Sequence, residues 1–513
     1  MIRLRRVTVS LPPVDSWSLV IAVCIQGTRK PCFLLAPPGS PVPPGSPVLL
    51  ENPDPTEHPA QPAACANPAP PVPIVAGIGN VAALPLREVT GGQLSLTELT
   101  GRRDTDATQP FAFLSTSFEP SGQEMLEVPR LMYAKYPDGT VKGTITVRED
   151  QALPSPAEAV QELMSYVPSY GIPIPVVQAS GAPVSANATS GTAMFLANTA
   201  GTAGAAHVPA EAPNSTHHAG ALPPVERIDL EDMLSRAIKM LENGPLSKVV
   251  LSWKRSIATP VPLPPFDVLV TMRTHEPAGW LLAHITPESA FVGITPELIL
   301  SRWKSTVESL PIAGTIAPRM AIHKNAPYAT SLDTPQHESP DESLETILFK
   351  SAKDRLEHKI TVDEVVSAFN RFCRSVHAPP EPEILRLSSV IHLQSPVSGQ
   401  LLPELDVPST TLKLLQELHP TPAVAGVPRK LALETIAALE KDDRGPYAGI
   451  TGWIAQDGNG CFVLNIRTAT ITGSTVQFQA GAGLVKSSDP RNEAREIEAK
   501  LESIATMIRC DER

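Results

Sequence analysis

The sequence predicts an α+β fold, in which helices are mixed with strands that pair antiparallel. Residues 228–244 have the apolar spacing of an amphipathic helix, and residues 248–316 then contain several strand-like runs in succession. Helical and strand-like segments follow one another to the end of the chain without the regular alternation of a doubly wound sheet. The sequence also has no internal repeat, no GxGxxG after a strand, and no GxxxxGK(S/T) or GxSxG motif.

Length and composition favour an intracellular protein with a large core and argue against some classes of partner. The 513 residues, 42% of them apolar, can bury a large core and by length could form about two to four domains. A formal net charge of −11 argues against nucleic acid or an anionic membrane as partner. The six cysteines show no CxxC and no metal-ligand spacing, as expected in a reducing compartment. We therefore expect a cytoplasmic protein, a monomer or weak oligomer, with no nucleic-acid or membrane partner.

The first 25 residues are expected to form strands. Arg3, Arg5 and Arg6 precede the first acidic residue, which leaves a transit peptide as an alternative. However, VTVS (7–10) and SLVIAVCI (18–25) resemble strands more closely. The apolar run in the second segment is also much shorter than the ~20 residues of a membrane span.

Two segments of biased composition divide the chain. Residues 35–73 are dense in proline and alanine, and residues 178–221 are rich in alanine, glycine, threonine and serine. Neither has enough apolar surface to offset the entropy cost of ordering, so we expect a linker and a disordered insertion. Strand-like runs with turn signals over 111–147 indicate folded chain between them. The predicted division is N-terminal strands plus the Pro-rich segment (1–75), the N-terminal part of the fold (76–175), the insertion (176–222) and a C-terminal domain (223–513).

The C-terminal domain has the clearest periodicity. Gly244 suits the cap of the helix at 228–244, and Asp489 before Pro490 suits the start of the last helix. Strands are expected within 248–261, 290–303, 308–316 and 390–401, a helix over 430–439, and an irregular polar segment over 317–340. A long amphipathic helix is expected over 343–372, with Leu344, Ile347, Leu348, Leu356, Ile360, Val365 and Phe369 on its buried side.

Acidic residues on two of these helices could form a metal site. Glu493 and Glu496 lie three residues apart and share a helix face, although such a pair alone is typical of a solvated surface. Glu357 follows Lys353 by one helical turn, which could equally be a surface ion pair. If the two helices meet over a pocket, carboxylates without cysteine or histidine ligands would suit Mg²⁺.

Arg467 and a glycine-rich segment are candidates for binding a carboxylate. In FVLNIRTAT the alternation places Arg467 in the middle of a strand, on the face opposite Phe462 and Leu464. Near AGAG (480–483), its guanidinium could hold a carboxylate bidentately, with help from backbone N–H groups. An arginine at a sheet edge that faces solvent is the alternative.

Three further residues could take part in acid–base chemistry. Lys248 begins an apolar strand, and Glu297 follows Pro296 in an equally apolar segment. Surroundings of low polarity favour the neutral forms, so the lysine could act as a base and the glutamate as an acid near neutral pH. His419 in LHPTPAVAG is the third candidate. Each of these residues, taken alone, could also be structural.

These motifs in this order resemble the chorismate-utilising enzymes: isochorismate synthase, salicylate synthase, anthranilate synthase component I and aminodeoxychorismate synthase. The motifs that match are KVVLSWKR, GITPELIL, PIAGT, SAKDRLEH, LHPTPAVAGVPR, RGPYAG, NIRTA and AGAGLVKSSDPRNEAREIEAK. They cover 228–508, with a weaker match over 105–175. The resemblance implies two large antiparallel sheets packed face to face with helices outside, and it makes 223–513 the chorismate-binding catalytic domain.

Three positions favour a family member that adds water without a lyase step. Ala313 occupies the place of the nucleophilic lysine of aminodeoxychorismate synthases, and Lys248 the place where anthranilate synthases typically have glutamine. Ala423 lies where members that eliminate pyruvate tend to have threonine. The resemblance thus implies an isochorismate synthase, an isomerase, with salicylate synthase, anthranilate synthase component I or an inactive binding protein as alternatives. HPTPA resembles the 2,3-dihydroxybenzoate siderophore branch more than the menaquinone branch, and Arg319–Met320 departs from the family's usual RG.

The resemblance also implies a role for each candidate residue. Lys248 would deprotonate the water that attacks C2 of chorismate, Glu297 would protonate the departing C4 hydroxyl, and His419 would line the reaction centre. Glu357 and Glu496, with Glu493 acting through water, would hold the Mg²⁺ that binds the ring carboxylate. The substrate itself, with its enolpyruvyl carboxylate, would be held by Gly314, Thr315, Ala423, Tyr447, Arg467, Gly481 and Gly483.

Overall fold

The structure is a computed structural model of the full chain, and it describes residues 4–14, 16–27, 29–38, 40, 72–90, 109–118, 124–167, 224–316 and 343–508. Most of the expected linker, the whole of the expected insertion and the irregular segment at 317–340 lie outside the described residues. Leu35 and Ala36, which we assigned to the linker, belong to a strand instead.

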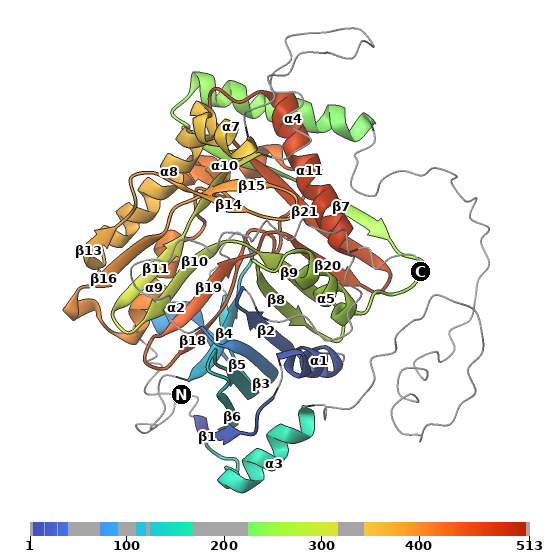
Figure 1. Cartoon of the computed structure of the whole chain (residues 1–513), viewed down its shortest axis with the longest axis vertical. Coiled ribbons are helices and arrows are strands. Elements are labelled where there is room, and N and C mark those ends of the chain that lie inside the picture. The colour runs from blue at the N-terminus through green and yellow to red at the C-terminus, as the bar shows by residue number, and fades with distance from the viewer. Residues whose placement is uncertain are drawn as a thin grey trace.

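Helices and antiparallel strands together confirm the α+β class (Figure 1). The strands are β1 (Leu4–Leu11), β2 (Cys32–Ala36), β3 (Ile74–Pro85), β4 (Pro110–Ser115), β5 (Met125–Lys135), β6 (Val141–Arg148), β7 (Lys248–Ala258), β8 (Trp280–Ile285), β9 (Ala290–Thr295), β10 (Leu298–Trp303), β11 (Thr306–Leu310), β12 (Ile312–Ile316), β13 (Cys373–His377), β14 (Glu383–Arg386), β15 (Ile391–Gln394), β16 (Val397–Leu401), β17 (Gly426–Val427), β18 (Ile450–Ala455), β19 (Gly460–Leu464), β20 (Thr468–Thr472) and β21 (Thr475–Leu484). The helices are α1 (Ser16–Gly27), α2 (Leu86–Thr90), α3 (Pro156–Tyr166), α4 (Pro224–Asn243), α5 (Pro265–His275), α7 (Leu344–Lys350), α8 (Ala352–Asn370), α9 (Pro408–Leu418), α10 (Arg429–Leu439) and α11 (Pro490–Ile508), with a short 3-10 turn at Pro403–Leu405.

Antiparallel pairing joins the N-terminal and C-terminal strands into one network. In the described part of the chain, 18 strands belong to this network, and β12, β15 and β14 form a separate three-stranded sheet. Strand β4 pairs with β18, and β2 pairs with β8, so strands far apart in sequence lie side by side. The N-terminal strands are therefore part of the same architecture as the strands that follow α4.

The network packs against itself across an apolar inner core. Phe33 of β2 stacks on Phe113 of β4 with ring centroids 5.1 Å apart, although these two strands are not paired with each other. Alternate residues of the strands point into this core, as the two-residue repeat of a strand requires. They include Leu35, Trp280, Leu282, Trp453, Ala455, Cys461 and Val463. The expected face-to-face packing of antiparallel sheets is confirmed.

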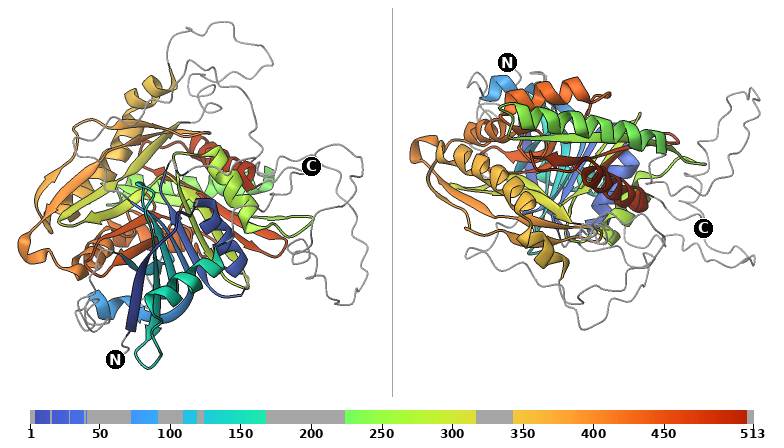
Figure 2. Two further views of the ribbon diagram at one scale, coloured as in Figure 1. Left: turned by 60° about the horizontal axis from the view of Figure 1, so that its bottom comes forward. Right: turned by 90° about the horizontal axis from the view of Figure 1, so that it is seen from above.

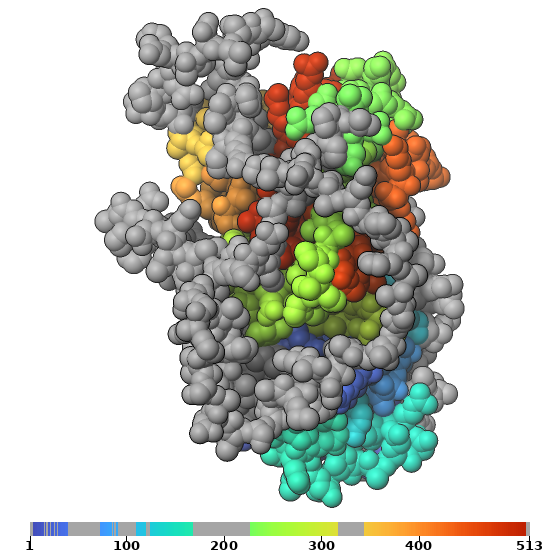
Figure 3. Space-filling view, turned by 90° about the vertical axis from the view of Figure 1, so that its right-hand side faces the viewer, coloured from blue at the N-terminus to red at the C-terminus, as the bar shows by residue number. Residues whose placement is uncertain are grey.

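Helices cover the outer faces of the sheets. In Figure 1, α4, α10 and α11 lie at the upper end of the molecule, and α1 and α3 lie at the lower end. The turned views of Figure 2 show the same helices outside the strands. In the space-filling view of Figure 3, the segment with α3 forms the base of the face shown, and α4 and α11 form its top. Helix α11 packs on β21 and α8 packs on β12, which brings these two helices to the cavity described below.

Two expectations about secondary structure were wrong. SLVIAVCI is part of helix α1 and not a strand, because a uniformly apolar run is buried equally well in either form. The expected helix over 343–372 is two helices that meet at Ser351, whose hydroxyl accepts a hydrogen bond from the Asp354 N–H at 3.3 Å and caps α8. Leu356, expected on the buried side, is 49% exposed.

Candidate active site

The predicted site residues meet around one cavity between β12, β21, α8 and α11. The cavity has a volume of about 710 Å³, part of it open to solvent. The predicted residues that line it are Glu297, Gly314, Thr315, Glu357, Ala423, Tyr447, Arg467, Gly481, Gly483 and Glu496. Lys248, Glu493 and His419 do not belong to its lining. The structure therefore places residues from segments up to two hundred positions apart around a single space.

Glu297 is the residue with the clearest character of an acid. It lies between β9 and β10, is only 2% exposed, and lines the cavity. Its backbone is fixed, because its N–H donates to the Thr295 hydroxyl at 3.3 Å and its carbonyl accepts from the Leu464 N–H at 3.1 Å. Burial raises the pKa of Glu297 to about 8, against the opposing effect of Lys248. The carboxyl group is thus mostly protonated at neutral pH.

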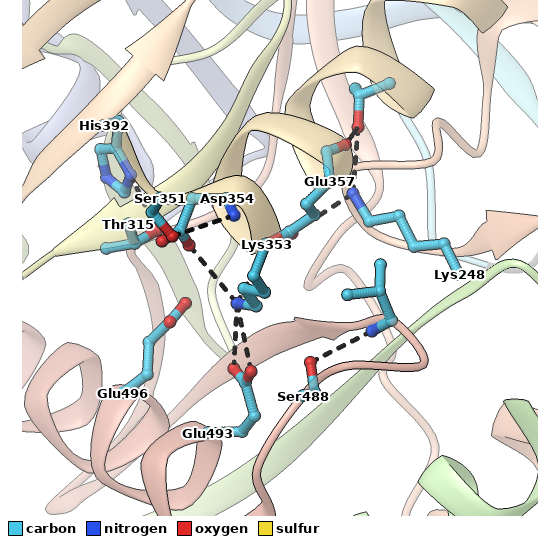
Figure 4. Close-up of polar contacts among 12 residues, drawn as sticks. Lys248, Thr315, Ser351, Lys353, Asp354, Glu357, His392, Ser488, Glu493 and Glu496 are labelled. Carbon is cyan, nitrogen blue, oxygen red and sulfur yellow. Dashed lines mark hydrogen bonds and ion pairs between the residues drawn. The ribbon is translucent and has the colours of Figure 1, made fainter. Parts of the chain in front are cut away.

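Lys248 is the first residue of β7 and is fully buried. Its Nζ lies 3.0 Å from the Thr361 hydroxyl and 3.3 Å from Oε1 of Glu357 (Figure 4). Burial lowers the pKa of Lys248, while Glu357 acts in the opposite direction. The lysine reaches the edge of the cavity beside Gly483, where a Cβ atom would lie 1.9 Å from Glu357 Oε1 and 3.1 Å from Lys248 Cε. Only glycine at 483 leaves room for this pair.

The three predicted metal-binding carboxylates come from facing helices, Glu357 from α8 and Glu493 and Glu496 from α11. All three are buried, and each has a lysine partner. Lys353 lies 3.4 Å from Glu357 and 3.1 Å from Glu493, while Lys500 lies 2.8 Å from Glu496. Burial raises the pKa of Glu493 to about 7; Lys353 opposes this shift, and the neighbouring carboxylates add to it.

Arg467 also lines the cavity. It is not in the middle of a strand, as we expected, but in the connection between β19 and β20 with a φ of 54°. Its Nη2 lies 3.1 Å from Nε2 of His392, and its Nη1 lies 3.5 Å from Glu276. Burial holds the pKa of His392 well below its usual range, so the ring is neutral and Nε2 accepts the hydrogen bond from the arginine. A buried guanidinium with Nη1 lacking a hydrogen-bond partner is suited to a carboxylate ligand.

The glycines around the cavity keep its walls close together. A Cβ at Gly481 would lie 2.8 Å from the carbonyl of Leu251 and 3.2 Å from the Tyr447 hydroxyl. Gly314 has a φ of 77°, and a Cβ there would lie 3.0 Å from the backbone of Asp354. Thr315 follows it and lies 3.0 Å from Nδ1 of His392. A larger side chain at either glycine would fill the cavity or separate β12 from α8.

His419 is placed apart from this group. It ends α9, and its buried ring lies next to the backbone of Ser117 and Phe118. Burial lowers the pKa of its ring to about 4. Sequence reasoning missed other residues that do face the cavity, His392, Lys500 and Gln479. His392 lies in an alternating strand much like a core residue, and the pair Glu496–Lys500 has the spacing of a surface ion pair, so neither gave a distinctive signal.

The cavity combines a buried acid, buried carboxylates with lysine partners and a buried arginine, as expected of an enzyme site for a small polar molecule. The chain belongs to the family of chorismate binding enzymes, whose profile matches residues 186–506. In the described part of the chain, no helix is both long enough and apolar enough to cross a membrane.

Several isochorismate synthases are similar to this chain. It is 33% identical to isochorismate synthase DhbC of Bacillus subtilis over 302 residues. This aligned region covers 58% of this chain and 70% of that protein. It is 31% identical to the vibriobactin-specific isochorismate synthase of Vibrio cholerae over 272 residues. This aligned region covers 53% of this chain and 64% of that protein. The fold is similar to that of MenF, the menaquinone-specific isochorismate synthase of Escherichia coli, with a TM-score of 0.66 at 20% identity over 99% of this chain and 95% of the other.

Proposed function

We propose that this chain is an isochorismate synthase, an isomerase that converts chorismate to isochorismate. The observation that supports the proposal is the pair of buried groups with opposite shifts, Glu297 in the cavity lining with a raised pKa and Lys248 beside Gly483 of that lining with a lowered one. These are the directions of shift that a general acid and a general base require. The isochorismate synthases among the similar proteins support the same choice.

The proposed reaction needs one base and one acid. Water gives a proton to neutral Lys248 while its oxygen forms a bond to C2 of the ring. The conjugated double bonds shift by one position, and the C4 hydroxyl leaves as water with the proton of Glu297. One water enters and one water leaves, so the sum is an isomerisation, and a proton returns from Lys248 to Glu297 before the next turnover. Arg467 and Tyr447 hold the enolpyruvyl carboxylate, which fixes the ring between acid and base.

The residues around the cavity favour water as the nucleophile. Ala313 is one of the lining residues, so no amine is present at the position where a covalent intermediate would form. Ala423 also lines the cavity and offers no hydroxyl to orient the enolpyruvyl group for its elimination. A salicylate synthase and an anthranilate synthase component I are the alternatives within the family, and an inactive binding protein is the alternative outside catalysis.

We infer that Mg²⁺ is the cofactor and that Glu357, Glu493 and Glu496 would hold it. The donors are all carboxylate oxygens, as Mg²⁺ prefers. The ammonium of Lys353 bridges Glu357 and Glu493, which supports a cation site between them. Within the described ranges no three acidic, histidine or cysteine side chains converge as a closed metal site, so the proposal depends on donor chemistry. Bound Mg²⁺ would neutralise the ring carboxylate of the substrate.

The wider setting is also part of the proposal. We infer a cytoplasmic enzyme, a monomer or weak oligomer without a nucleic-acid partner, that supplies isochorismate for a 2,3-dihydroxybenzoate siderophore, with menaquinone synthesis as the other possible use. We also keep the division at 1–75, 76–175, 176–222 and 223–513, with the catalytic residues in the last part.

Product analysis tests the proposal. The purified chain is incubated with chorismate and Mg²⁺, with and without ammonia, and the products are separated by liquid chromatography. Isochorismate is the expected product. Salicylate with pyruvate would identify a salicylate synthase, anthranilate formed only with ammonia would identify an anthranilate synthase, and binding without turnover would identify an inactive relative.

A further inference from the structure

Lys353 is the charged centre of the carboxylate cluster. Its Nζ lies 3.1 and 3.4 Å from the two oxygens of Glu493, 3.4 Å from Oε2 of Glu357 and 3.5 Å from Oδ1 of Asp354. Figure 4 shows the ammonium between α8 and α11, where it joins Glu493 to Asp354. The side chain is 20% exposed, and its carboxylate partners are 9% exposed or less. An ammonium held by carboxylates from two helices is in the position of a bound cation.

Two other lysines contact the carboxylates of this cluster. The second oxygen of Glu357 is paired with Lys248 at 3.3 Å, and Lys500 pairs with Glu496 and with the Gly481 carbonyl. Removal of Lys353 would take from Glu493 its lysine partner and leave Glu357 with Lys248 alone, which is unfavourable for buried carboxylates at low dielectric. The Lys353–Glu357 spacing of four residues looks like a surface pair in sequence, but α11 covers it with a third partner, Glu493.

We propose that Lys353 acts as an internal cation that takes the place of Mg²⁺ between Glu357 and Glu493, so that the metal binds by displacing it. This inference rests on the metal site proposed above. An ammonium and Mg²⁺ cannot occupy the same space between two carboxylates, and each lowers the affinity of the site for the other. Lys353 is therefore a positioning residue: it holds the ligands together in the metal-free chain, and it weakens the affinity for the metal.

Calorimetric titration of the metal-free full chain with MgCl₂, without chorismate, tests this competition. Lys353→Met removes the charge and keeps most of the side-chain length, and we expect its Kd for Mg²⁺ to fall by at least about tenfold. Lys353→Arg keeps the charge, and its Kd should stay within about threefold of the native value. Lys359→Met is the matched control, because Lys359 lies on the same helix in an exposed pair with Asp363. An unchanged or higher Kd in Lys353→Met would overturn the proposal.

A second measurement uses the unmodified chain, in case the methionine variant does not fold. Acetic anhydride labelling with mass spectrometry compares the acetylation of Lys353 with that of Lys359. Mg²⁺ should raise the labelling of Lys353 severalfold, because displacement frees its amine, and should leave Lys359 unchanged. Equal labelling with and without Mg²⁺ would refute displacement.

The outcomes separate this inference from the proposed function. Neither measurement contains chorismate, so neither depends on which product the enzyme forms. Isochorismate formation combined with no detectable Mg²⁺ binding to any variant would refute the metal site itself. Mg²⁺ binding of equal strength in the native chain and Lys353→Met would refute only the role of Lys353.

Discussion

Replacement of Glu297 by glutamine should abolish the proton donor while leaving the cavity intact. Glutamine has nearly the same shape, and the backbone contacts that fix position 297, to Thr295 and Leu464, do not involve the carboxyl group. An amide cannot give a proton to a departing hydroxyl at neutral pH. We therefore expect kcat to fall by about 10²-fold or more, the usual contribution of a general acid, while the Kd for chorismate changes little.

The structure also sets the pH range in which this acid works. With a pKa of about 8 for Glu297, roughly nine tenths of the molecules carry the proton at pH 7, whereas about 0.3% would at the ordinary value near 4.5. Burial therefore raises the fraction of active enzyme by a factor of about 300. Because the protonated form of Glu297 is required, kcat should fall as the pH rises through about 8.

The assay is the initial rate of isochorismate formation between pH 6 and 10 at saturating chorismate. Glu297→Gln should lose the alkaline decline together with the rate. Glu308→Gln is the control, because Glu308 is a half-buried glutamate on β11 outside the cavity lining, whose pKa is also raised by burial. A Glu297→Gln enzyme that keeps its kcat within threefold, with the same decline above pH 8, would refute the assignment of the acid.

Substitution of Lys248 tests the proposed base in the same assay. Lys248→Ala should cost about 10²-fold or more in kcat, and the double variant should be little worse than either single one, because both groups act in one transition state. Additive losses would mean that the two residues serve separate steps. Near-normal turnover by Lys248→Ala would show that another group activates the water and would favour ammonia as the natural nucleophile.

Three further predictions follow from the cavity walls. Removal of metal by EDTA should abolish turnover, and added Mg²⁺ should restore it. Glu357→Gln should sharply raise the Mg²⁺ concentration that gives the half-maximal rate. Full activity in metal-free buffer would contradict a metal site made of carboxylate oxygens. Ala423→Thr should release some salicylate and pyruvate, detected by fluorescence and a coupled assay, whereas salicylate from the native chain at the rate of isochorismate would identify another family member. Arg467→Gln should raise KM for chorismate by about tenfold or more, since it removes a charge-assisted hydrogen bond to a carboxylate; an unchanged KM would place the enolpyruvyl carboxylate elsewhere.

Periodicity was enough to predict most of the elements of the C-terminal half. The expected strands and the helices at 228–244 and 430–439 are present, because their apolar residues recur with the period of a strand or a helix or form short apolar runs bounded by turns. The pattern failed in SLVIAVCI, an apolar run that shows neither the period of a helix nor that of a strand, and where a single capping residue, Ser351, divides one apolar stripe between two helices. Neither the extent of burial nor a helix break is fixed by apolar spacing alone.

The sequence motifs predicted most residues of the candidate site, but they did not predict which charged residues pair with one another. Arg467 was expected in a strand because the alternation continues to residue 467, but β19 ends at Leu464 and a positive φ turns the arginine toward His392. The spacing of Lys353 and Glu357 left a surface ion pair open as an alternative, because spacing by four residues looks the same on an exposed and a buried helix face. The pair is buried because Glu493 of another helix contacts Lys353, and the sequence of a single helix gives no sign of such a contact.

The lining of the cavity contains both an arginine and carboxylates with lysine partners, and this bears on how the proposed dicarboxylate substrate would be oriented. Gly481 beside Tyr447 and Gly483 beside Glu357 lie on the same face of β21, about 7 Å apart along the strand. Arg467, which also lines the cavity, has one guanidinium nitrogen, Nη1, without a hydrogen bond, while Glu357 carries lysine partners and could accept a carboxylate only through a cation. In the proposed reaction, a ring held by its side-chain carboxylate at Arg467 would therefore present its own carboxylate to the proposed Mg²⁺. The proposed isomerisation further requires that this orientation place the reacting carbons between Glu297 and Lys248.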